Sequence, residues 1–165
     1  MNIAVFIISL FGIVGFFFFL HWISYKYFKN RVVMSRSWDL NVCSGKTDGG
    51  GVNVDIYKHT DVPNLVIVND VYNLPFKNNE FKSVLSSHTI EHVDDPKRFY
   101  DELSRVGEEV TLLVPPLWDV GAALNIFEHK WIFLTWRMKH AGLPAYVRLP
   151  GADVLQKKFG QINHA

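Results

Sequence analysis

The chain has 165 residues, enough for one domain, because domains of about 100–150 residues are the commonest. Removing the four basic residues of the segment 26–37 from the 17 in the chain leaves 13 basic against 16 acidic side chains. This balance argues against the basic patch of a nucleic-acid-binding protein, so no nucleic acid partner is expected. The single cysteine, Cys43, excludes an internal disulfide and is consistent with a reducing compartment.

Residues 1–25 are predicted to form a transmembrane helix. From Ile3 to Leu20 the chain has no charge, and Ser9 is the one polar side chain. A helix of about 20 apolar residues crosses the ~30 Å core of a bilayer, and the aromatic residues Trp22 and Tyr25 follow where an interface is expected. A secretory signal peptide fits less well, because no basic residue precedes the run. A buried core helix also fits less well, because the run is apolar on every side.

A basic juxtamembrane linker is predicted over residues 26–37, which contain no acid. Positive charge flanking a membrane span stays on the cytoplasmic side. The sequence therefore predicts a single-pass membrane protein whose remaining residues, 38–165, form one domain facing the cytoplasm. The basic residues of the linker are Lys26, Lys29, Arg31 and Arg36.

Five short apolar runs in this domain are predicted to be strands. They are nearly continuous in apolar character and rich in β-branched residues, which is typical of strands buried on both faces of a parallel sheet. The runs are residues 39–43, 52–56, 64–68, 81–86 and 110–114.

One helix is predicted between the fourth and fifth runs, beginning at Pro96 after two aspartates that can cap it and ending near Gly107. Strand, helix and strand with this spacing form a right-handed crossover unit. The predicted fold class is therefore α/β with an open, mostly parallel sheet. Beyond Pro116 the pattern is weaker: residues 131–136 fit a strand or a helix, and residues 146–149 resemble a strand.

Polar and small residues end the first four predicted strands. Because ligands of open α/β sheets bind beyond the carboxyl ends of the strands, these residues are expected around one crevice. A glycine there allows close approach of a ligand to the backbone, and an acid can accept hydrogen bonds from ribose hydroxyls. In chain order the strand ends are Cys43-Ser44-Gly45, Asp55, Asp70 and Ser86-Ser87-His88.

The segment from Leu40 to Pro115 resembles the class I S-adenosylmethionine-dependent methyltransferases, in particular the type 11 group. The most specific stretch runs from Asp70 to Pro96: an acid, Leu-Pro-Phe, a turn, Phe, a strand, a His, then Glu-His and an acidic turn before Pro. Arg105 and the valine after it also resemble the Arg-Val that ends the following helix in that family. The resemblance implies a shortened, Rossmann-like methyltransferase sheet preceded by the transmembrane helix, with S-adenosylmethionine as cofactor.

Carried over by position, the resemblance implies a role for each strand end. Asp55 would bind the ribose hydroxyls and Asp70 the adenine end, while Ser44 and Gly45 would line the methionine end. His88 would lie near the sulfonium and is the candidate catalytic base. The neighbouring residues Cys43, Ile56, Val71 and Ser87 complete the predicted cofactor-binding set.

The loop after the first strand departs from the family pattern. Family members carry several glycines there and then a helix, whereas here Gly45 stands alone and about ten residues separate it from Asp55. The later run Gly49-Gly50-Gly51 is expected to make a tight connection into the second strand. Lys82 also replaces a residue that is usually acidic in the family.

A second pattern overlaps the first, because residues 88–92 read His-Thr-Ile-Glu-His and match the His-x-x-Glu-His pattern of inverted zinc peptidases. Glu102 or Glu128 could supply a third ligand, but the acidic turn that follows leaves little helix to carry the motif. No metal site is therefore predicted. His129 is interpreted either as a structural histidine or as a residue lining the acceptor site.

The function predicted from these observations is methyl transfer from S-adenosylmethionine to an acceptor of unknown identity. The membrane anchor favours an acceptor that is a lipid, a quinone or a membrane-linked glycan. Two alternatives stay open: a catalytically inactive scaffold with the methyltransferase fold and, as a minor one, a zinc hydrolase built on the His-x-x-Glu-His pattern.

Overall fold

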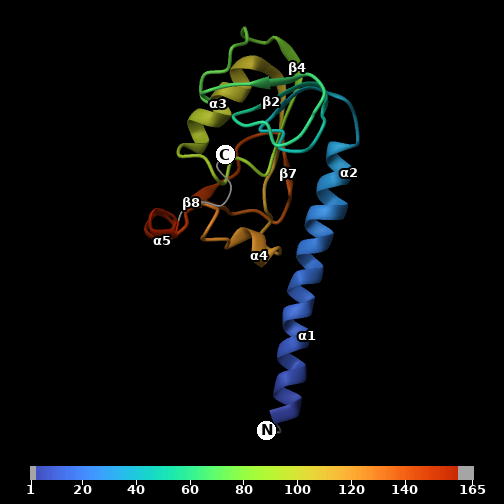
Figure 1. Ribbon diagram of the computed structural model, residues 1–165, viewed down its shortest axis with the longest axis vertical. Coiled ribbons are helices and arrows are strands. Elements are labelled where there is room, and N and C mark those ends of the chain that lie inside the picture. Colours follow the sequence, from blue (N-terminus) through green and yellow to red (C-terminus); the bar gives the residue numbers. More distant parts are fainter. Residues whose placement is uncertain (1–2, 160–165) are drawn as a thin grey trace.

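The computed structural model describes residues 3–159. It consists of a long N-terminal helix and an α/β domain at the carboxyl end of that helix (Figure 1). The helices are α1 (Ile3–Trp22), the π-helical segment η1 (Ile23–Lys29), α2 (Asn30–Val33), α3 (Pro96–Val106), α4 (Val120–Ala123) and α5 (Ala152–Phe159). The strands are β1 (Trp38–Val42), β2 (Gly50–Asp55), β3 (Leu65–Ile67), β4 (Phe81–Ser87), β5 (Gly107–Leu113), β6 (Trp131–Phe133), β7 (Lys139–His140) and β8 (Tyr146–Arg148).

The main sheet has the strand order β3-β2-β1-β4-β5-β7. Its first five strands are parallel, and β7 joins the edge of β5 antiparallel. The order 3-2-1-4-5 is that of the doubly wound Rossmann sheet. In this sheet the order in which strands are added reverses between β1 and β4. The predicted α/β class and the mostly parallel sheet are confirmed, and all five predicted strands are present.

The two faces of the sheet are covered by different elements. Val84 of β4 lies in the larger core with the apolar side of α3, whereas the adjacent Leu85 packs with Val33 and Trp38 in a second core. Because neighbouring side chains of a strand point to opposite faces, α3 covers one face and the end of the N-terminal helix covers part of the other. Helix α3 begins as predicted, with the Asp95 side chain accepting a hydrogen bond from the Arg98 backbone N–H at 3.0 Å.

The N-terminal helix continues without a break from Ile3 through η1 and α2 to Val33, so most of the predicted linker is helical. The segment Val5–Val33 is long and apolar enough to cross a membrane, and none of its most apolar part is buried against the domain. The Trp38 indole N–H then donates to the Val33 carbonyl at 2.9 Å, which fixes the helix end to the start of β1. The division into residues 1–25, 26–37 and 38–165 stays a prediction.

The region beyond Pro116 forms small elements rather than a further layer. The ambiguous run 131–136 contains the strand β6, and residues 146–149 contain β8, which pairs antiparallel with β6 in a separate two-stranded sheet. Helix α4 lies next to α1 (Figure 1). Glu128 and His129 lie in the segment between α4 and β6. They are brought close to the carboxyl ends of β1, β2 and β4.

Candidate functional site

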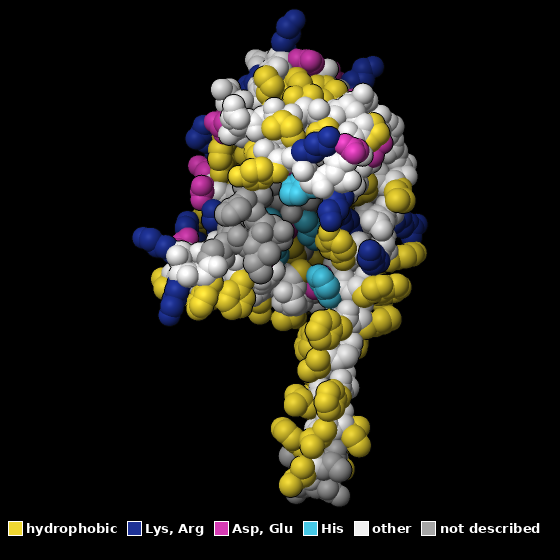
Figure 2. Space-filling model, in the orientation of Figure 1, with side chains coloured by type: hydrophobic (Ala, Val, Ile, Leu, Met, Phe, Trp, Pro, Cys, Tyr) yellow, Lys and Arg dark blue, Asp and Glu magenta, His cyan; other side chains and the backbone are white. Residues whose placement is uncertain are grey.

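A cavity of about 760 Å³ opens where the carboxyl ends of β1, β2 and β4 meet, a volume typical of small-molecule sites. In the space-filling view, histidine side chains gather in a hollow between the domain and the N-terminal helix (Figure 2). Of the residues predicted from the strand ends, the cavity is lined by Cys43, Ser44, Gly45, Asp55, Ser87 and His88.

The chain turns sharply at the end of β1 to form one wall of this cavity. Cys43 and Gly45 both adopt positive φ angles, 55° and 58°, and between them the Ser44 backbone N–H donates to the Val54 carbonyl at 3.0 Å. A Cβ atom at Gly45 would meet nothing within 4 Å, so this wall leaves open space for a ligand. A left-handed conformation is costly for Cys43, and such strain is commonly found at functional sites.

The Asp55 carboxylate at the end of β2 is 4% exposed and held by the backbone. Its Oδ2 accepts from the Gly45 N–H at 2.8 Å, and its Oδ1 accepts from the N–H groups of Ile56 at 2.8 Å and Tyr57 at 3.3 Å. A carboxylate offers about four acceptor positions, so about one remains for a hydroxyl group of a ligand. Asp55 therefore both shapes the loop after β1 and faces the cavity.

Three other predicted residues are not brought to this cavity. Asp70 is exposed, where its Oδ1 accepts from the Tyr72 N–H at 2.8 Å and its Oδ2 lies 3.8 Å from Arg98 Nη2. Val71 is buried in the core, and Ile56 packs against it. Their roles in cofactor binding, at the adenine end for Asp70, stay predictions, and none of the three lines the cavity.

His88 follows β4 with a φ angle of 54°. Its backbone N–H donates to the Leu113 carbonyl at 2.9 Å, and its ring Nδ1 lies 3.3 Å from Glu91 Oε1. The ring Nε2 is buried without a hydrogen-bond partner among the described residues, as are the hydroxyl groups of Ser44 and Ser87. Buried polar atoms are normally paired, so these three atoms at one cavity fit a polar ligand.

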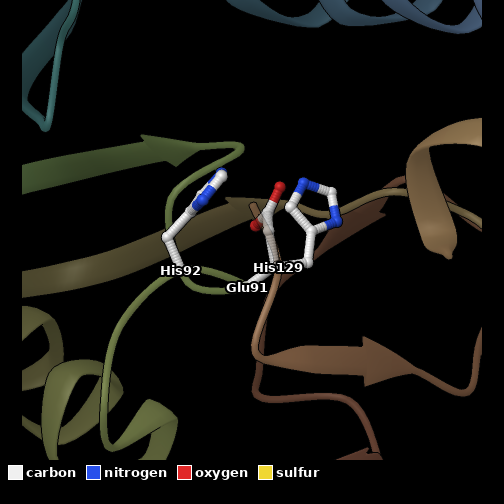
Figure 3. A group of neighbouring side chains, drawn as sticks. All are labelled: Glu91, His92 and His129. Carbon is white, nitrogen blue, oxygen red and sulfur yellow. The ribbon is translucent and has the colours of Figure 1, made fainter. Parts of the chain in front are cut away.

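A group of side chains that the strand ends did not predict lies on the opposite wall. Glu91 is fully buried, and His92 and His129 stand on either side of its carboxylate (Figure 3). Burial opposes ionisation of Glu91, but the contact with His88 and the charges of the surrounding histidines outweigh it and lower the pKa of Glu91 to about 2. Burial disfavours the charged form of His129 and lowers its pKa to about 4, although the nearby Glu91 carboxylate raises that pKa.

The His-x-x-Glu-His pattern was the sequence signal for part of this group. In the structure His88 ends a strand and residues 90–92 form turns, so the helix that places both histidines of a zinc peptidase on one face is absent. The third member of the group, His129, comes from a distant segment. It is tied to this loop because the Lys130 N–H donates to the Glu91 carbonyl at 2.8 Å.

The N-terminal helix supplies the remaining wall of the cavity. Several of its apolar side chains line the cavity. Its His21 Nδ1 lies 3.2 Å from both carboxylate oxygens of Asp119, which caps α4. The sequence indicated only an anchor here, because no local pattern reveals that a helix also packs against a distant loop. The helix residues that line the cavity are Val14, Phe17, Phe18, His21, Tyr25 and Lys29.

The Cys43 thiol should react slowly with alkylating reagents although it lines the cavity. Burial, followed by the nearby Asp55 carboxylate, raises the pKa of the thiol well above its usual range, more than a contact with Thr89 lowers it. Because only the thiolate reacts, we expect alkylation by iodoacetamide at pH 8 to be at least about 10-fold slower in the folded protein than in urea. Mass spectrometry follows the rate, and equal rates in both conditions would contradict this assignment.

Comparison with known proteins gives one family match and several similar solved structures. Residues 48–112 match the family model for a methyltransferase domain, and no curated protein matches the chain. A SAM-dependent methyltransferase of Thermotoga maritima is similar at 17% identity and a TM-score of 0.46, covering 66% of this chain and 59% of that one. The YcgJ protein of Bacillus subtilis is similar at 17% identity and a TM-score of 0.46, covering 61% and 59%.

The protein solved with the Trm112 methyltransferase activator of Haloferax volcanii is similar at 18% identity and a TM-score of 0.42, covering 57% of this chain and 52% of that one. The chain therefore spans between half and three fifths of the length of these three proteins. The family match lies on the strands that carry Asp55 and His88. The strand order of the sheet is that of a Rossmann-like fold.

Proposed function

We propose that the chain binds S-adenosylmethionine in this cavity and transfers its methyl group to a membrane-associated acceptor, because residues 48–112 match the family model for a methyltransferase domain. The observation that carries the proposal is the meeting of Asp55 with the unpaired polar atoms of Ser44, Ser87 and His88 at the carboxyl ends of three parallel strands. S-adenosylmethionine supplies an electrophilic methyl group on a sulfonium, and the chain mainly has to hold an acceptor in line with it.

The residues of the cavity fit this task. Asp55 keeps about one acceptor position for a ribose hydroxyl, and the open space beside Gly45 admits the cofactor close to the backbone. His88 is the proposed proton acceptor. With its Nδ1 proton directed at the Glu91 carboxylate 3.3 Å away, its Nε2 keeps a lone pair for the proton that an acceptor hydroxyl, amine or thiol loses.

Contacts between the N-terminal helix and the cavity support an acceptor that resides in the membrane. Phe17 and Phe18 line the cavity and belong to a segment apolar enough to span a bilayer. Helix α4 also lies next to α1 (Figure 1), and Val120 in α4 and Leu124 and Phe127 after it are exposed apolar side chains. A lipid-like acceptor could therefore keep its apolar part along α1 while its polar end reaches His88.

The basic residues that follow the span favour a single-pass protein with its domain on the cytoplasmic face. In this arrangement Lys29, which lines the cavity, lies near the level of the lipid headgroups. Its Nζ also lies 4.0 Å from the centre of the Tyr25 ring, a cation–π contact that holds it at the mouth of the cavity. A cation there favours an acceptor with an anionic headgroup.

The proposal is tested by titrating S-adenosylhomocysteine into the full-length chain in lipid nanodiscs. We expect micromolar binding by calorimetry, weakened at least about 30-fold by Asp55→Ala through loss of the hydroxyl contact and loosening of the Gly45 loop. Asp61→Ala, at an exposed aspartate that pairs with Lys58, is the matched control and should bind normally. Ser87→Leu, which narrows the cavity without removing a structural hydrogen bond, should also abolish binding.

Circular dichroism shows whether each variant is folded. A folded wild-type chain that does not bind S-adenosylhomocysteine would overturn the proposal, as would undiminished binding by both Asp55→Ala and Ser87→Leu. Asp70→Ala, in the same assay, decides whether that exposed aspartate has the adenine role implied by the resemblance: a loss of affinity would support it.

A catalytically inactive scaffold is the second candidate, favoured by one observation. The connection from β1 to β2, residues 43–49, contains no helix and only two glycines, so the cofactor wall is shorter than in the family. A scaffold would bind S-adenosylhomocysteine or nothing, and would not transfer radiolabelled methyl groups from S-adenosylmethionine to membrane extracts. Label recovered in the lipid fraction only with the wild-type chain would exclude this candidate.

A further inference from the structure

Glu91 is a fully buried carboxylate whose close contact among the described ring nitrogens is His88 Nδ1, 3.3 Å from its Oε1. Neither oxygen of Glu91 has a hydrogen bond of good geometry from a described residue. Leaving such a charge unpaired is costly, and buried charges are normally paired or bound to a metal ion. The side chains around Glu91 are imidazole rings, which can be neutral, rather than lysine or arginine side chains. This environment suits a bound metal cation.

The side chains of Glu91, His92 and His129 converge from two segments (Figure 3). Their ligand atoms all lie within 4.8 Å of one another, and the rings of His92 and His129 are 4.7 Å apart. Ligand atoms on zinc bonds of about 2.0–2.1 Å are about 3.3 Å apart in a tetrahedral site, so the separations in the group have to shorten by up to about 1.5 Å. Rotation of the two imidazole rings and of the carboxylate supplies a movement of this size.

The hydrogen bond of the His92 ring leaves one of its nitrogen lone pairs available to the group. His92 Nδ1 lies 2.9 Å from the Glu128 carbonyl, which can only accept, so Nδ1 carries the proton and Nε2 has the free lone pair. A ring N–H that donates to a carbonyl is the usual support of a metal-binding histidine. The His129 ring turns its Nε2 toward the Glu91 carboxylate (Figure 3). Its Nδ1 points away from Glu91 and is buried without a hydrogen-bond partner among the described residues.

The backbone around the group is held in place before any ion binds. The Glu91 carbonyl accepts from the N–H groups of Lys130 and Trp131, at 2.8 and 3.3 Å. The His129 N–H donates to the Asn125 carbonyl at 2.7 Å, and its own carbonyl accepts from Gln156 Nε2 at 2.9 Å. The two segments that carry the ligands are therefore joined to each other and to α5.

We propose that Glu91, His92 and His129 form a binding site for a zinc-type divalent metal ion with one open coordination position facing the cavity. Two imidazoles and one carboxylate are a ligand set of catalytic zinc sites, in which the fourth position is left for water or substrate. All three residues line the same cavity as Asp55 and His88. In the role that rests on the proposed function, the open position takes an oxygen or sulfur atom of the methyl acceptor.

The test measures metal binding by the full-length chain in nanodiscs after removal of any affinity tag and dialysis against a chelator. After equilibrium dialysis with ZnCl₂, we expect about one zinc per chain by mass spectrometry of the element, as for a single three-ligand site. Co²⁺ should produce the visible absorption bands of a four-coordinate ion. Zinc should also raise the unfolding temperature of the chain, because it binds only the folded state.

Variants assign the binding to this site. Glu91→Gln keeps the shape of the side chain and removes a buried charge, so it should fold, yet we expect at least about 100-fold weaker zinc binding for Glu91→Gln and His129→Ala. His140→Ala is the matched control, because His140 lies on β7 and bonds to Thr135 and Arg137 outside the group. Zinc binding that is absent in the wild type, or unchanged in both ligand variants, would overturn the proposal, as would an equal loss in His140→Ala.

The outcome for the metal is separable from the outcome for the cofactor. S-adenosylhomocysteine is titrated into the zinc-free chain, whose cofactor contacts at Asp55 and Ser87 involve none of the three ligands. Binding of S-adenosylhomocysteine without any zinc uptake overturns the metal site alone. Zinc uptake without S-adenosylhomocysteine binding overturns the proposed methyl transfer and leaves the metal site standing.

Discussion

Replacing Arg105 by alanine should lower the free energy of unfolding by about 2–3 kcal/mol, because it removes a partly buried network of hydrogen bonds and leaves the buried Glu102 carboxylate with the Leu74 N–H as its remaining donor. Arg105 donates five hydrogen bonds. Two go to the carboxylate of Glu102, which is 8% exposed, and the others go to the carbonyls of Leu74 and Phe76 and to Asn78. Urea unfolding of the chain in detergent micelles, followed by tryptophan fluorescence, measures the change.

The same helix offers a control for this substitution. Lys97 pairs with Asp101 at 2.6 Å, but both side chains are exposed, so Lys97→Ala should cost less than about 1 kcal/mol. Arg105→Lys should recover little stability, because an ammonium group cannot form the same fork of hydrogen bonds. Equal stabilities of the Arg105 and Lys97 variants would show that the network does not hold the loop 70–80 to α3.

Gly51→Ala is the second substitution with a large expected effect. A Cβ atom at Gly51 would lie 2.5 Å from the carbonyl oxygens of both Trp38 and Asp39. These are backbone atoms of β1, so the clash is relieved only by moving β1 and β2 apart. We expect a loss of about 2–3 kcal/mol in the same unfolding measurement, typical of severe overpacking, together with weaker S-adenosylhomocysteine binding, because Asp55 lies at the far end of β2.

Gly142→Ala is a suitable comparison for the β2 glycine. The nearest atom to a Cβ there is the Tyr100 hydroxyl at 3.8 Å, an ordinary contact. Its effect should stay within about 0.5 kcal/mol, as for most surface substitutions. A Gly51→Ala chain as stable as Gly142→Ala would show that the two strands can separate without penalty.

The elements that sequence reasoning predicted well are those in which local pattern and tertiary environment agree. Strands β1, β4 and β5 are largely buried, so their apolar runs are visible in the sequence, and α3 has both a capping aspartate and a regular apolar side. Strand β5 begins at Gly107, three residues before its predicted start, because this glycine fits against Val84, where a Cβ atom would meet the Val84 side chain.

The candidate site was predicted only in part, for a reason that is physical. Strand ends of a parallel sheet are brought together by the fold class itself, so Ser44, Asp55 and His88 could be expected at one cavity. The pairing of Glu91 with His129 depends on how the chain returns after Pro116, a region without strong periodicity. The packing of Phe17 beside the cavity is also long-range, since an apolar span looks the same whether lipid or protein surrounds it.

If the N-terminal helix spans a bilayer as proposed, its unbroken course to the sheet has a consequence for how acceptors reach the domain. At a rise of 1.5 Å per residue, the 29 residues from Val5 to Val33 extend about 44 Å, of which about 30 Å would lie in the hydrocarbon core. The Trp38 contact leaves no flexible joint between this rod and β1. In the proposed arrangement, a domain held this rigidly stays at a fixed distance from the bilayer. It then meets membrane molecules through their lateral diffusion. The selectivity for an acceptor then depends on how far its reactive atom lies from the bilayer. Only an acceptor whose reactive atom lies at the same distance from the bilayer as His88 can react, whatever its abundance elsewhere in the cell.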